Sequence, residues 1–238
     1  MFRHQGKTRT LKHNKQIASL LSFVAGMVNV AGFLVVKKLT TNVTGHFAFF
    51  IDEVFKMHAA ESAIYFLYIF FFFLGSFCSS FLIESMQKKS ERFIYVIPTL
   101  IEAFLLLAVA FIGHHANDYP DVIAFILLFA MGLQNALVTR ISDAMIRTTH
   151  LTGLFTDLGI ELSQLFFYRE AEQRLKLKTN IRLRFRIILF FFLGGIAGGI
   201  FYSRFGLSEL FLPAILLLIG LYYDNVKYQL LKWAKLDH

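Results

Sequence analysis

The sequence predicts an all-α membrane protein with about six transmembrane helices, arranged as two inverted-topology repeats of three helices each. The chain of 238 residues is 56% apolar and contains 29 phenylalanines, a composition that is not typical of a water-exposed surface. In addition, the polar heptapeptide "TNVTGHF" at 41–47 returns 108 positions later as "THLTGLF" at 149–155. The first observation predicts the membrane, and the second predicts an internal repeat.

Runs of roughly 20 apolar residues are long enough to cross the hydrocarbon core of a bilayer. Six runs of this kind are expected to span the membrane, namely 17–36, 62–86, 93–113, 121–139, 185–203 and 207–223. A basic polar leader, 1–16, precedes the first run. Because that run is long and no small-x-small site closes a short apolar core, it predicts a retained anchor rather than a cleaved signal peptide.

The basic residues are distributed unevenly between the predicted loops. If the N-terminus is cytoplasmic, the outside segments hold only Lys37, Lys38, Lys56 and Arg204 of the 24 Lys and Arg residues. Cytoplasmic loops of membrane proteins carry such an excess of basic residues. The distribution predicts a protein of the cytoplasmic (inner) membrane with both termini in the cytoplasm. The net charge of +8 is therefore explained by the basic residues of the cytoplasmic segments, and no nucleic-acid partner is predicted.

Further landmarks repeat in the same order around the two heptapeptides. "AGMVNVAG" and "MGLQNALV" precede them, and "FFFLGSFCSSF" and "FFFLGGIAGGI" follow them. Two of the three prolines, Pro98 and Pro213, fall at equivalent places in the third run of each half. Four landmarks in one order indicate duplication, which is a signal to be sought before other features are interpreted.

The duplication predicts a domain organisation in two halves. Three crossings per unit force the second unit to enter the membrane from the opposite side, and such inverted repeats are typical of secondary transporters with a site near the midplane. A duplication that only builds a stable bundle or a channel is the alternative. The predicted divisions are the leader 1–16, repeat 1 over 17–113 with a re-entrant segment at 41–58, repeat 2 over 121–223 with a re-entrant segment at 149–168 and a charged insertion at 169–186, and a cytoplasmic tail at 224–238.

Each heptapeptide leads into a segment of about 15 residues that carries carboxylates and is too short for a full span. Thr, Asn and Gly before such a segment indicate a helix N-cap. Two inverted half-helices that start at membrane depth would aim free N–H groups and positive dipole ends at a solute. The predicted site consists of Asn29, Thr41, Thr44 and Gly45 facing Asn135, Thr149, Thr152 and Gly153.

Less specific interpretations of these residues stay open. The heptapeptides could be ordinary helix caps at the membrane interface. The two asparagines, deep in apolar runs, could line the solute path, clamp the broken backbone beside them, or join helices for assembly.

Several carboxylates are candidates for ion or proton coupling. Aligning the heptapeptides places Glu53 opposite Glu161, with Asp157 one turn earlier in the second copy. Glu102 lies inside an apolar run, where the aligned residue of the second half is Leu217. Ionisable groups inside membrane segments are functional candidates by default. Pairing with a polar neighbour, or a position closer to the interface, is the alternative for Glu102.

Signatures of enzymes and cofactor sites are not found in the sequence. It contains no glycine-flanked serine elbow, no HExxH, no paired cysteines and no P-loop. His114 and His115 with Asp118 or Asp121 could bind a metal, but a solvated loop is the expected reading, because adjacent histidines do not share a face well. No catalytic residue, metal or cofactor is therefore predicted.

Two stretches carry a family resemblance. "GMVNVAGFLVVKKLTTNVTGHF" and "AMGLQNALVTRISDAMIRTTHLTGLFTDLG" resemble the two signature regions of the YoaK-like family, bacterial membrane proteins classed under a domain of unknown function. The resemblance runs from about residue 15 to residue 225. It implies about six spans and a cytoplasmic-membrane location, with no established substrate or reaction. The insertion at 169–186 is a departure that makes the second half longer.

The leading functional hypothesis is a small secondary transporter of a polar small solute, anions included, that works by alternating access. A channel on the same frame and a non-transporting scaffold or regulatory protein are the alternatives. The expected partners are the solute, a second copy of the chain in a homodimer, and the anionic cytoplasmic leaflet. The amphipathic tail "VKYQLLKWAKLDH" is expected to contact that leaflet.

Overall fold

The computed structural model describes residues 11–87, 94–113, 118–142, 146 and 148–233, with the side chains of 11, 12 and 225–233 left aside. Helices make up nearly all of this part of the chain, and no strand occurs in it. The helices are α1 (Leu11–Val36), α2 (Thr44–Phe55), α3 (Ala59–Gln87), α4 (Val96–Ile112), α5 (Pro120–Ile141), α6 (Leu151–Phe167), α7 (Ala171–Phe205), the short 3₁₀ helix η3 (Gly206–Leu210) and α8 (Phe211–Trp233).

Four stretches of the described chain are long and apolar enough to cross a membrane. They are His13–Val36, Ala59–Gln87, Pro120–Ile141 and Ala171–Asp224, the last of which contains both α7 and most of α8. The apolar helix Val96–Ile112 is shorter. Every one of the six predicted runs therefore overlaps a helix, and the protein is an all-α membrane protein, while six separate crossings stay a prediction.

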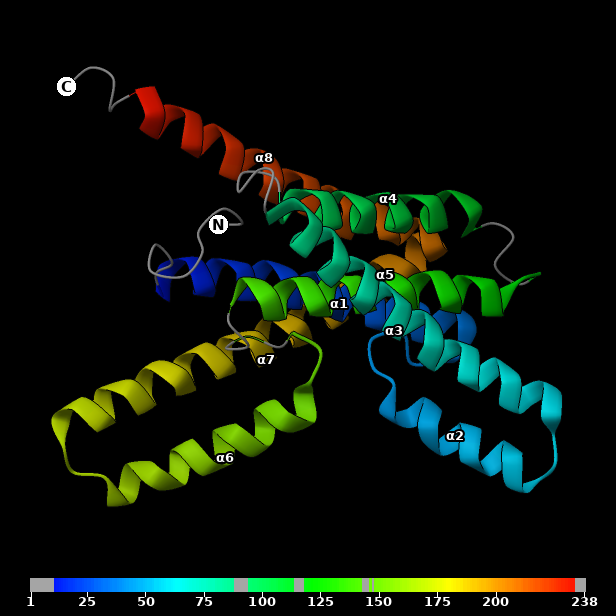
Figure 1. Ribbon diagram of the computed structural model, residues 1–238, viewed down its shortest axis with the longest axis horizontal. Helices are drawn as coiled ribbons and strands as arrows, with labels where there is room; N and C mark the ends of the chain where they lie inside the picture. Colours follow the sequence, from blue (N-terminus) through cyan, green and yellow to red (C-terminus); the bar gives the residue numbers. More distant parts are fainter. Residues whose placement is uncertain (1–10, 88–93, 114–117, 143–145, 147, 234–238) are drawn as a thin grey trace.

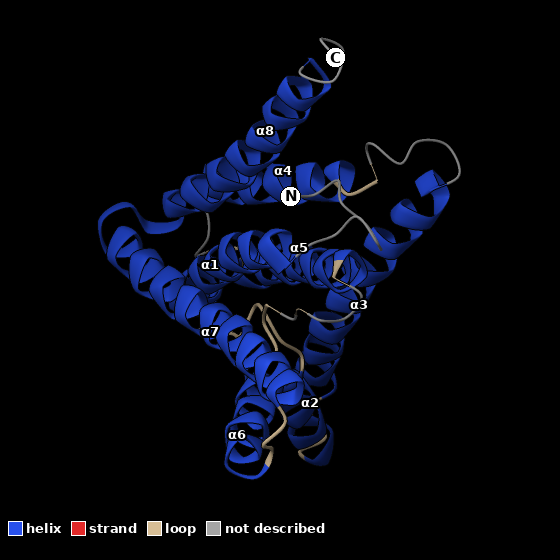
Figure 2. Cartoon of the chain, turned by 90° about the vertical axis from the view of Figure 1, so that its left-hand side faces the viewer, coloured by secondary structure: helices blue, strands red, loops and turns tan. Residues whose placement is uncertain are grey.

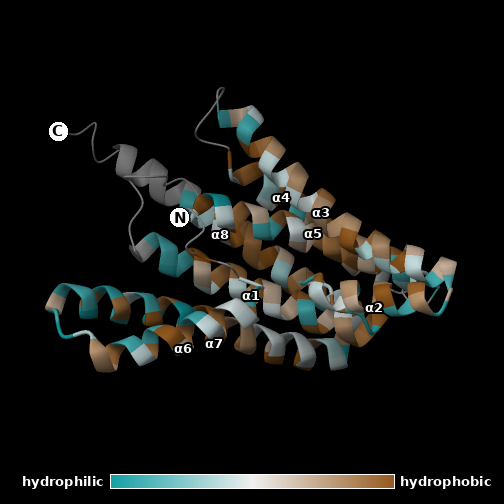
Figure 3. Ribbon diagram, turned by 60° about the horizontal axis from the view of Figure 1, so that its bottom comes forward, coloured by the Kyte–Doolittle hydropathy of each residue, from teal (hydrophilic) through white to brown (hydrophobic). Residues whose placement is uncertain are grey.

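Apolar side chains on the outside of the bundle agree with a lipid environment. Phe73, Phe77 and Phe81 lie along one side of α3 and are each more than half exposed, as is Phe192 of α7. Contiguous exposed apolar surface of this kind is rare on soluble monomers. Figure 3 shows hydrophobic colours along the bundle, with hydrophilic colours concentrated at the end where α6 meets α7.

The long helices exchange partners between the two halves of the sequence. α1 packs most extensively against α7, and α5 packs most extensively against α3, while α1 also contacts α5. Viewed along the long axis, α1 and α5 lie at the centre with α3 and α7 on either side (Figure 2). α4 and α8 pack together on one side of the central pair, and α2 and α6 lie on the other side.

Glycines bring the exchanged helices into backbone contact. A Cβ added at Gly26 of α1 would overlap the carbonyl oxygen of Phe191 on α7, and one added at Gly132 of α5 would overlap that of Phe72 on α3. Small residues at helix interfaces allow such close approach in membranes. Gly75 in "FFFLGSFCSSF" and Gly194 in "FFFLGGIAGGI" meet the carbonyl oxygens of Phe129 and Phe23 in the same way, so both repeated stretches join helices from different halves.

The two short helices run in opposite directions along the molecule. In Figure 1, α2 (blue) and α6 (green) both begin nearer the middle of the long axis and extend toward opposite ends. Each then turns back into the long helix that follows, so that α2 packs on α3 and α6 packs on α7. The segments before them, 37–43 and 148–150, are not helical, as expected for broken segments at the repeated motif.

The lengths of two helices differ from the sequence-based boundaries. Most of the charged insertion at 169–186 is helical, because its residues from 171 onward form about the first half of the 35-residue helix α7. α8 continues to Trp233, so that much of the predicted tail from 224 is helical. Pro98 and Pro213 are each the third residue of their helix, α4 and α8, where the backbone N–H has no helical partner to lose.

Candidate functional site

A hydrogen bond fixes the polar segment of the first heptapeptide to α1. The Thr41 hydroxyl donates to Asn29 Oδ1 over 2.7 Å, and Thr41 itself is buried. The chain reaches this position by turning back after α1, where Lys37 has a positive φ of 55° and its N–H bonds the Phe33 carbonyl. An asparagine inside an apolar helix thereby receives the partner that it requires.

The second heptapeptide makes the equivalent bond to α5. The Thr149 hydroxyl donates to Asn135 Oδ1 over 2.8 Å. Both asparagines are partly buried on the two helices at the centre of the bundle. Of the sequence-predicted site residues, Asn29 is thus brought together with Thr41, and Asn135 with Thr149. The geometry matches the interpretation in which each asparagine clamps the broken backbone.

A second threonine in each copy, missed at the sequence level, reinforces this clamp. Thr40 is fully buried and donates to the Val28 carbonyl over 3.2 Å. Thr148, also fully buried, accepts a bond of 3.4 Å from Gln134 Nε2, which in addition donates to the Leu21 carbonyl of α1 over 2.9 Å. The available signal was a threonine doublet, "TT", that occurs in both copies, at 40–41 and at 148–149.

Thr44, Gly45, Thr152 and Gly153 do not join the asparagines. Thr44 and Thr152 are exposed at the starts of α2 and α6. The helix caps are Val43 and His150, and neither makes a side-chain capping bond. The expectation that Thr, Asn or Gly caps these helices was therefore wrong, and the Thr41 and Thr149 hydroxyls bond to the asparagines instead.

His46 distinguishes the first half from the second. Its side chain is buried, its Nε2 lies 2.6 Å from the Leu39 carbonyl, and its ring packs on Tyr68 at a centroid distance of 4.8 Å. The equivalent residue of the second half is Leu154, which is buried and apolar. The two copies therefore differ in polarity directly behind the start of the short helix.

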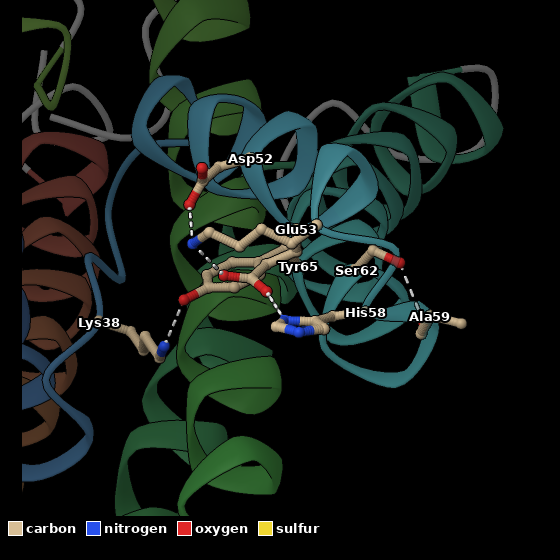
Figure 4. Close-up of polar contacts among 8 residues, drawn as sticks. Lys38, Asp52, Glu53, His58, Ala59, Ser62 and Tyr65 are labelled. Atoms are coloured by element: carbon tan, nitrogen blue, oxygen red, sulfur yellow. Dashed lines mark hydrogen bonds and ion pairs between the residues drawn. The ribbon is translucent and has the colours of Figure 1, made fainter.

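The coupling candidate Glu53 lies in an exposed charged cluster at the turn from α2 to α3 (Figure 4). Its carboxylate lies 2.8 Å from His58 Nδ1 and 3.3 Å from Lys56 Nζ. The hydrogen bond from His58 lowers the pKa of Glu53, and Lys56 acts in the same direction. Nearby, Lys38 from the broken segment donates to the Tyr65 hydroxyl of α3 over 2.7 Å (Figure 4).

The candidates of the second half are ion-paired as well. Arg184 of α7 makes a bidentate contact with Glu161, at 2.9 and 3.1 Å, and contacts Asp157 at 2.8 Å. Bidentate pairs of this kind are geometrically specific. Arg184, which sequence reasoning did not single out, comes from the charged insertion, and its role depends on α6 and α7 lying side by side.

Glu102 differs from the other carboxylates. It is fully buried on α4, and among the described residues neither of its oxygens has a hydrogen-bond partner. Glu209 in η3, which is 3% exposed, has the same property within the described chain. Since buried polar groups are rarely left unpaired, both carboxyls require an explanation beyond packing.

Two grooves lie at related positions on the exchanged helix pairs. One, about 430 Å³, follows α1, α6 and α7 and is lined almost entirely by apolar residues such as Val30 and Phe155. The other, about 300 Å³, lies between α3 and α5 and has polar lining. The residues that line this second groove are Ser76, Ser80, Asn135, Ala136, Thr139 and Arg140.

Comparison with known proteins decides the family. The family model described as "Protein of unknown function (DUF1275)" matches residues 17–223. The chain belongs to the DUF1275 family. It is also 25% identical, over 179 residues, to a protein of Bacillus subtilis (strain 168) named "UPF0700 transmembrane protein YoaK", with 71% of this chain and 76% of that protein covered. No solved structure matches the chain.

Membership of the DUF1275 family confirms the resemblance to YoaK-like membrane proteins. The matched region begins near the start of the first predicted span and ends near the end of the last, so it contains both heptapeptides. The family description names no solute and no reaction.

Proposed function

We propose that this DUF1275 protein is a small secondary transporter of a polar small solute, with anions as the favoured class. The observation that carries the proposal is the pair of equivalent Thr–Asn hydrogen bonds, Thr41 to Asn29 and Thr149 to Asn135. They hold two broken segments against two central helices, α1 and α5, which contact one another. Broken helices at a repeat interface are where secondary transporters bind their solutes.

The arrangement of the helices supports an inverted relation between the halves. Exchanging α1 with α5, α2 with α6, α3 with α7 and α4 with α8 maps the α1–α7 contact onto the α5–α3 contact. The same exchange maps the α4–α5 contact onto the α8–α1 contact. α2 and α6 extend to opposite ends, as expected for units that enter a membrane from opposite sides (Figure 1).

Alternating access then has two natural moving bodies. One consists of α1, α6 and α7, and the other of α5, α2 and α3, since the glycine contacts hold the long helices of each body at backbone distance. The bodies meet through α1 and α5. Rocking at this contact would expose the asparagines first to one side of the membrane and then to the other.

The polar groove between α3 and α5 supports a preference for anions. Asn135 lines it together with Arg140, which also contacts Glu84. A guanidinium beside hydroxyl and amide donors is suited to a carboxylate or another oxyanion. The matching groove of the other body is apolar, so we assign solute entry to the α3–α5 side.

Glu102 is the coupling candidate that we retain. Glu53, Asp157 and Glu161 have basic partners, whereas Glu102 is buried without a partner in the described chain. An unpaired carboxylate is costly to bury, which makes this residue a place where a proton would be bound during the cycle.

We further infer that the protein lies in the cytoplasmic (inner) membrane with both termini in the cytoplasm. α1 begins and α8 ends at the same end of the molecule (Figure 1). The hydrophilic α6–α7 connection lies at that end too (Figure 3). The basic residues of α7 are thereby gathered on one side, as the excess of cytoplasmic positive charge requires.

The test is uptake by the purified protein in sealed vesicles. Labelled phosphate, sulfate, acetate, glutamate, glucose, uracil and sodium would each be offered with and without an inward proton gradient. We expect saturable uptake of at least one anion, accelerated when the vesicles contain the same unlabelled anion. Thr41→Val and Thr149→Val, which remove only the hydroxyl bonded to asparagine, should each reduce that uptake by at least tenfold. Thr41→Ser, which keeps the hydroxyl, should transport like the wild type.

A matched control and two contrary outcomes make this test decisive. Thr156→Val removes a hydroxyl that bonds only its own helix at the Thr152 carbonyl, and it should leave uptake unchanged. Flux that never saturates and shows no exchange would favour a channel. The absence of any flux, together with no change in thermal stability with any of these solutes, would favour a scaffold.

A further inference from the structure

A groove beside the start of α1 carries an unbalanced positive charge. It has a volume of about 560 Å³ and lies between α1 and the middle of α7. Its charged lining comes from Lys15 on α1 and from Arg182 and Arg186 on α7. No acidic residue of the described chain makes an ion pair with any of the three, and Arg184 between them is turned toward Asp157 and Glu161 on α6.

This charge distribution is unfavourable for the protein alone. Arg182 and Arg186 are four positions apart on one helix, and like charges at that spacing repel one another. Lys15 adds a third positive group because α1 packs along α7. An anion bound among the three would relieve the repulsion and receive charge-assisted hydrogen bonds from Lys and Arg.

The rest of the groove is apolar and open to the surroundings of the bundle. Phe185 is 58% exposed, and Leu189 is 39% exposed. Moving along α7 from Arg182 toward Gly194, the residues change from charged to apolar. A ligand that places its charge among the basic residues would therefore lay a hydrocarbon portion on the rest of the lining, which consists of Ile181, Phe185, Leu189 and Phe190.

We propose that this groove is a binding site for an anionic phospholipid of the surrounding bilayer. The phosphate would lie among Lys15, Arg182 and Arg186, and an acyl chain would lie along the exposed aromatic and aliphatic side chains of α7. A free phosphate has no hydrocarbon portion to contact the apolar lining, whereas a phospholipid matches both the charge and the apolar residues of the groove. Basic pockets at the cytoplasmic ends of membrane helices are suited to such headgroups.

The test measures lipid binding by the full-length protein in neutral detergent, from thermal unfolding over a range of lipid concentrations. The probes are dioleoyl phosphatidylglycerol, dioleoyl phosphatidylcholine, which has the same tails, and glycerol 3-phosphate, which has no tails. Only phosphatidylglycerol should raise the unfolding temperature strongly. The triple variant K15Q/R182Q/R186Q should bind it roughly a hundredfold more weakly, because each basic group contributes separately near an anionic headgroup.

The control variant R174Q/K176Q/K178Q also removes three positive charges, all of them from α7 and outside the groove, and it should bind like the wild type. Equal loss of binding in both triple variants would overturn the proposal, since it would mean that only net charge matters. Stabilisation by glycerol 3-phosphate alone would contradict the proposal and indicate that the groove binds a soluble anion. Equal stabilisation by phosphatidylcholine would show that the groove does not recognise the charge of the headgroup.

A second measurement keeps the proposal testable if the triple variant does not fold. Phe185→Trp in a Trp233→Phe background places the only tryptophan of the chain beside the groove. Brominated phosphatidylglycerol diluted into phosphatidylcholine vesicles should quench its fluorescence at least twofold more than brominated phosphatidylcholine at the same fraction. Equal quenching by the two lipids would contradict the assignment.

Discussion

Threonine hydroxyls at the repeated motif bond to the preceding long helix rather than to the short helix that follows. Thr41 and Thr149 each donate to an asparagine of the previous helix, and Thr40 donates to a carbonyl of α1. A capping bond at the next helix would have satisfied one free N–H. The observed bonds instead satisfy polar groups inside apolar helices, where water is not available as a substitute partner.

Glu102 allows a prediction that separates stability from function. Replacing an unpaired buried carboxyl by an apolar side chain of similar size should be stabilising, by about 1–3 kcal/mol. We expect Glu102→Leu to raise the unfolding temperature of the detergent-purified protein, as the fully buried Leu217 at the equivalent position suggests. The same variant should lose any dependence of uptake on a proton gradient.

The reciprocal change provides the control for this prediction. Leu217→Glu should lower the unfolding temperature, because it buries a new carboxyl in the apolar contact of α4 and α8. A loss of stability in Glu102→Leu would contradict the interpretation and indicate that Glu102 contributes to packing.

At the scale of elements, the exchanged helix pairs depend on residues without side chains. An added methyl group at Gly26 or Gly132 would meet a carbonyl oxygen of α7 or α3. We predict that Gly26→Ala and Gly132→Ala each lower stability by about 1–3 kcal/mol, as overpacking does. Thermal unfolding of the purified protein would measure this.

Gly159 provides the matched control for the helix propensity of the two residue types. It lies on α6 with no atom within 4 Å of an added Cβ. Alanine is the better helix former by about 1 kcal/mol, so Gly159→Ala should be neutral or stabilising. If all three variants had the same effect, close helix approach would not be the reason for the glycines.

The turn between α2 and α3 should respond to acid. The pKa of Glu53 is lowered from its ordinary value of 4.5, first of all by its hydrogen bond with His58. A depressed carboxyl pKa stabilises the fold above the unfolded-state value, and the contribution is lost as the pH falls through the lower folded-state value. We expect amide protection at His58, whose N–H bonds the Glu53 carbonyl, to fall as the pH drops below 4.5.

Hydrogen exchange, corrected for the intrinsic pH dependence of exchange, would measure this protection. Glu53→Gln should show lower protection at neutral pH and a flatter pH profile. An unchanged profile in this variant would assign the acid response to the neighbouring pair of Lys56 and Asp52.

At the scale of the whole molecule, the two short hairpins provide a test of orientation. The α2–α3 connection and the α6–α7 connection lie at opposite ends (Figure 1). In a background without Cys78, we predict that a cysteine replacing Met57 is labelled by an impermeant maleimide from outside intact cells. A cysteine replacing Gln173 should be labelled only after permeabilisation. Both positions are exposed, so labelling from the same side would contradict an inverted relation.

Much of the fold followed from local sequence features. Each predicted apolar run overlaps a helix, the two prolines occupy the same helical position, and both polar segments interrupt the helices where the heptapeptides stand. Of the candidate site, the Asn29–Thr41 and Asn135–Thr149 pairs are brought together. The ion pairs of Glu161 and Asp157 could not be predicted, because their partner Arg184 lies on a different helix.

The sequence by itself determined the membrane environment, the helices and the repeated polar breaks, since these depend on composition and on short-range patterns. Only the tertiary structure decided that α1 packs on α7 and α5 on α3. In a soluble protein, the apolar face of a helix indicates the side that packs. Here the lipid-facing and the protein-facing sides are both apolar, and the choice of partner depends on steric fit between glycine-lined backbones far apart in the chain.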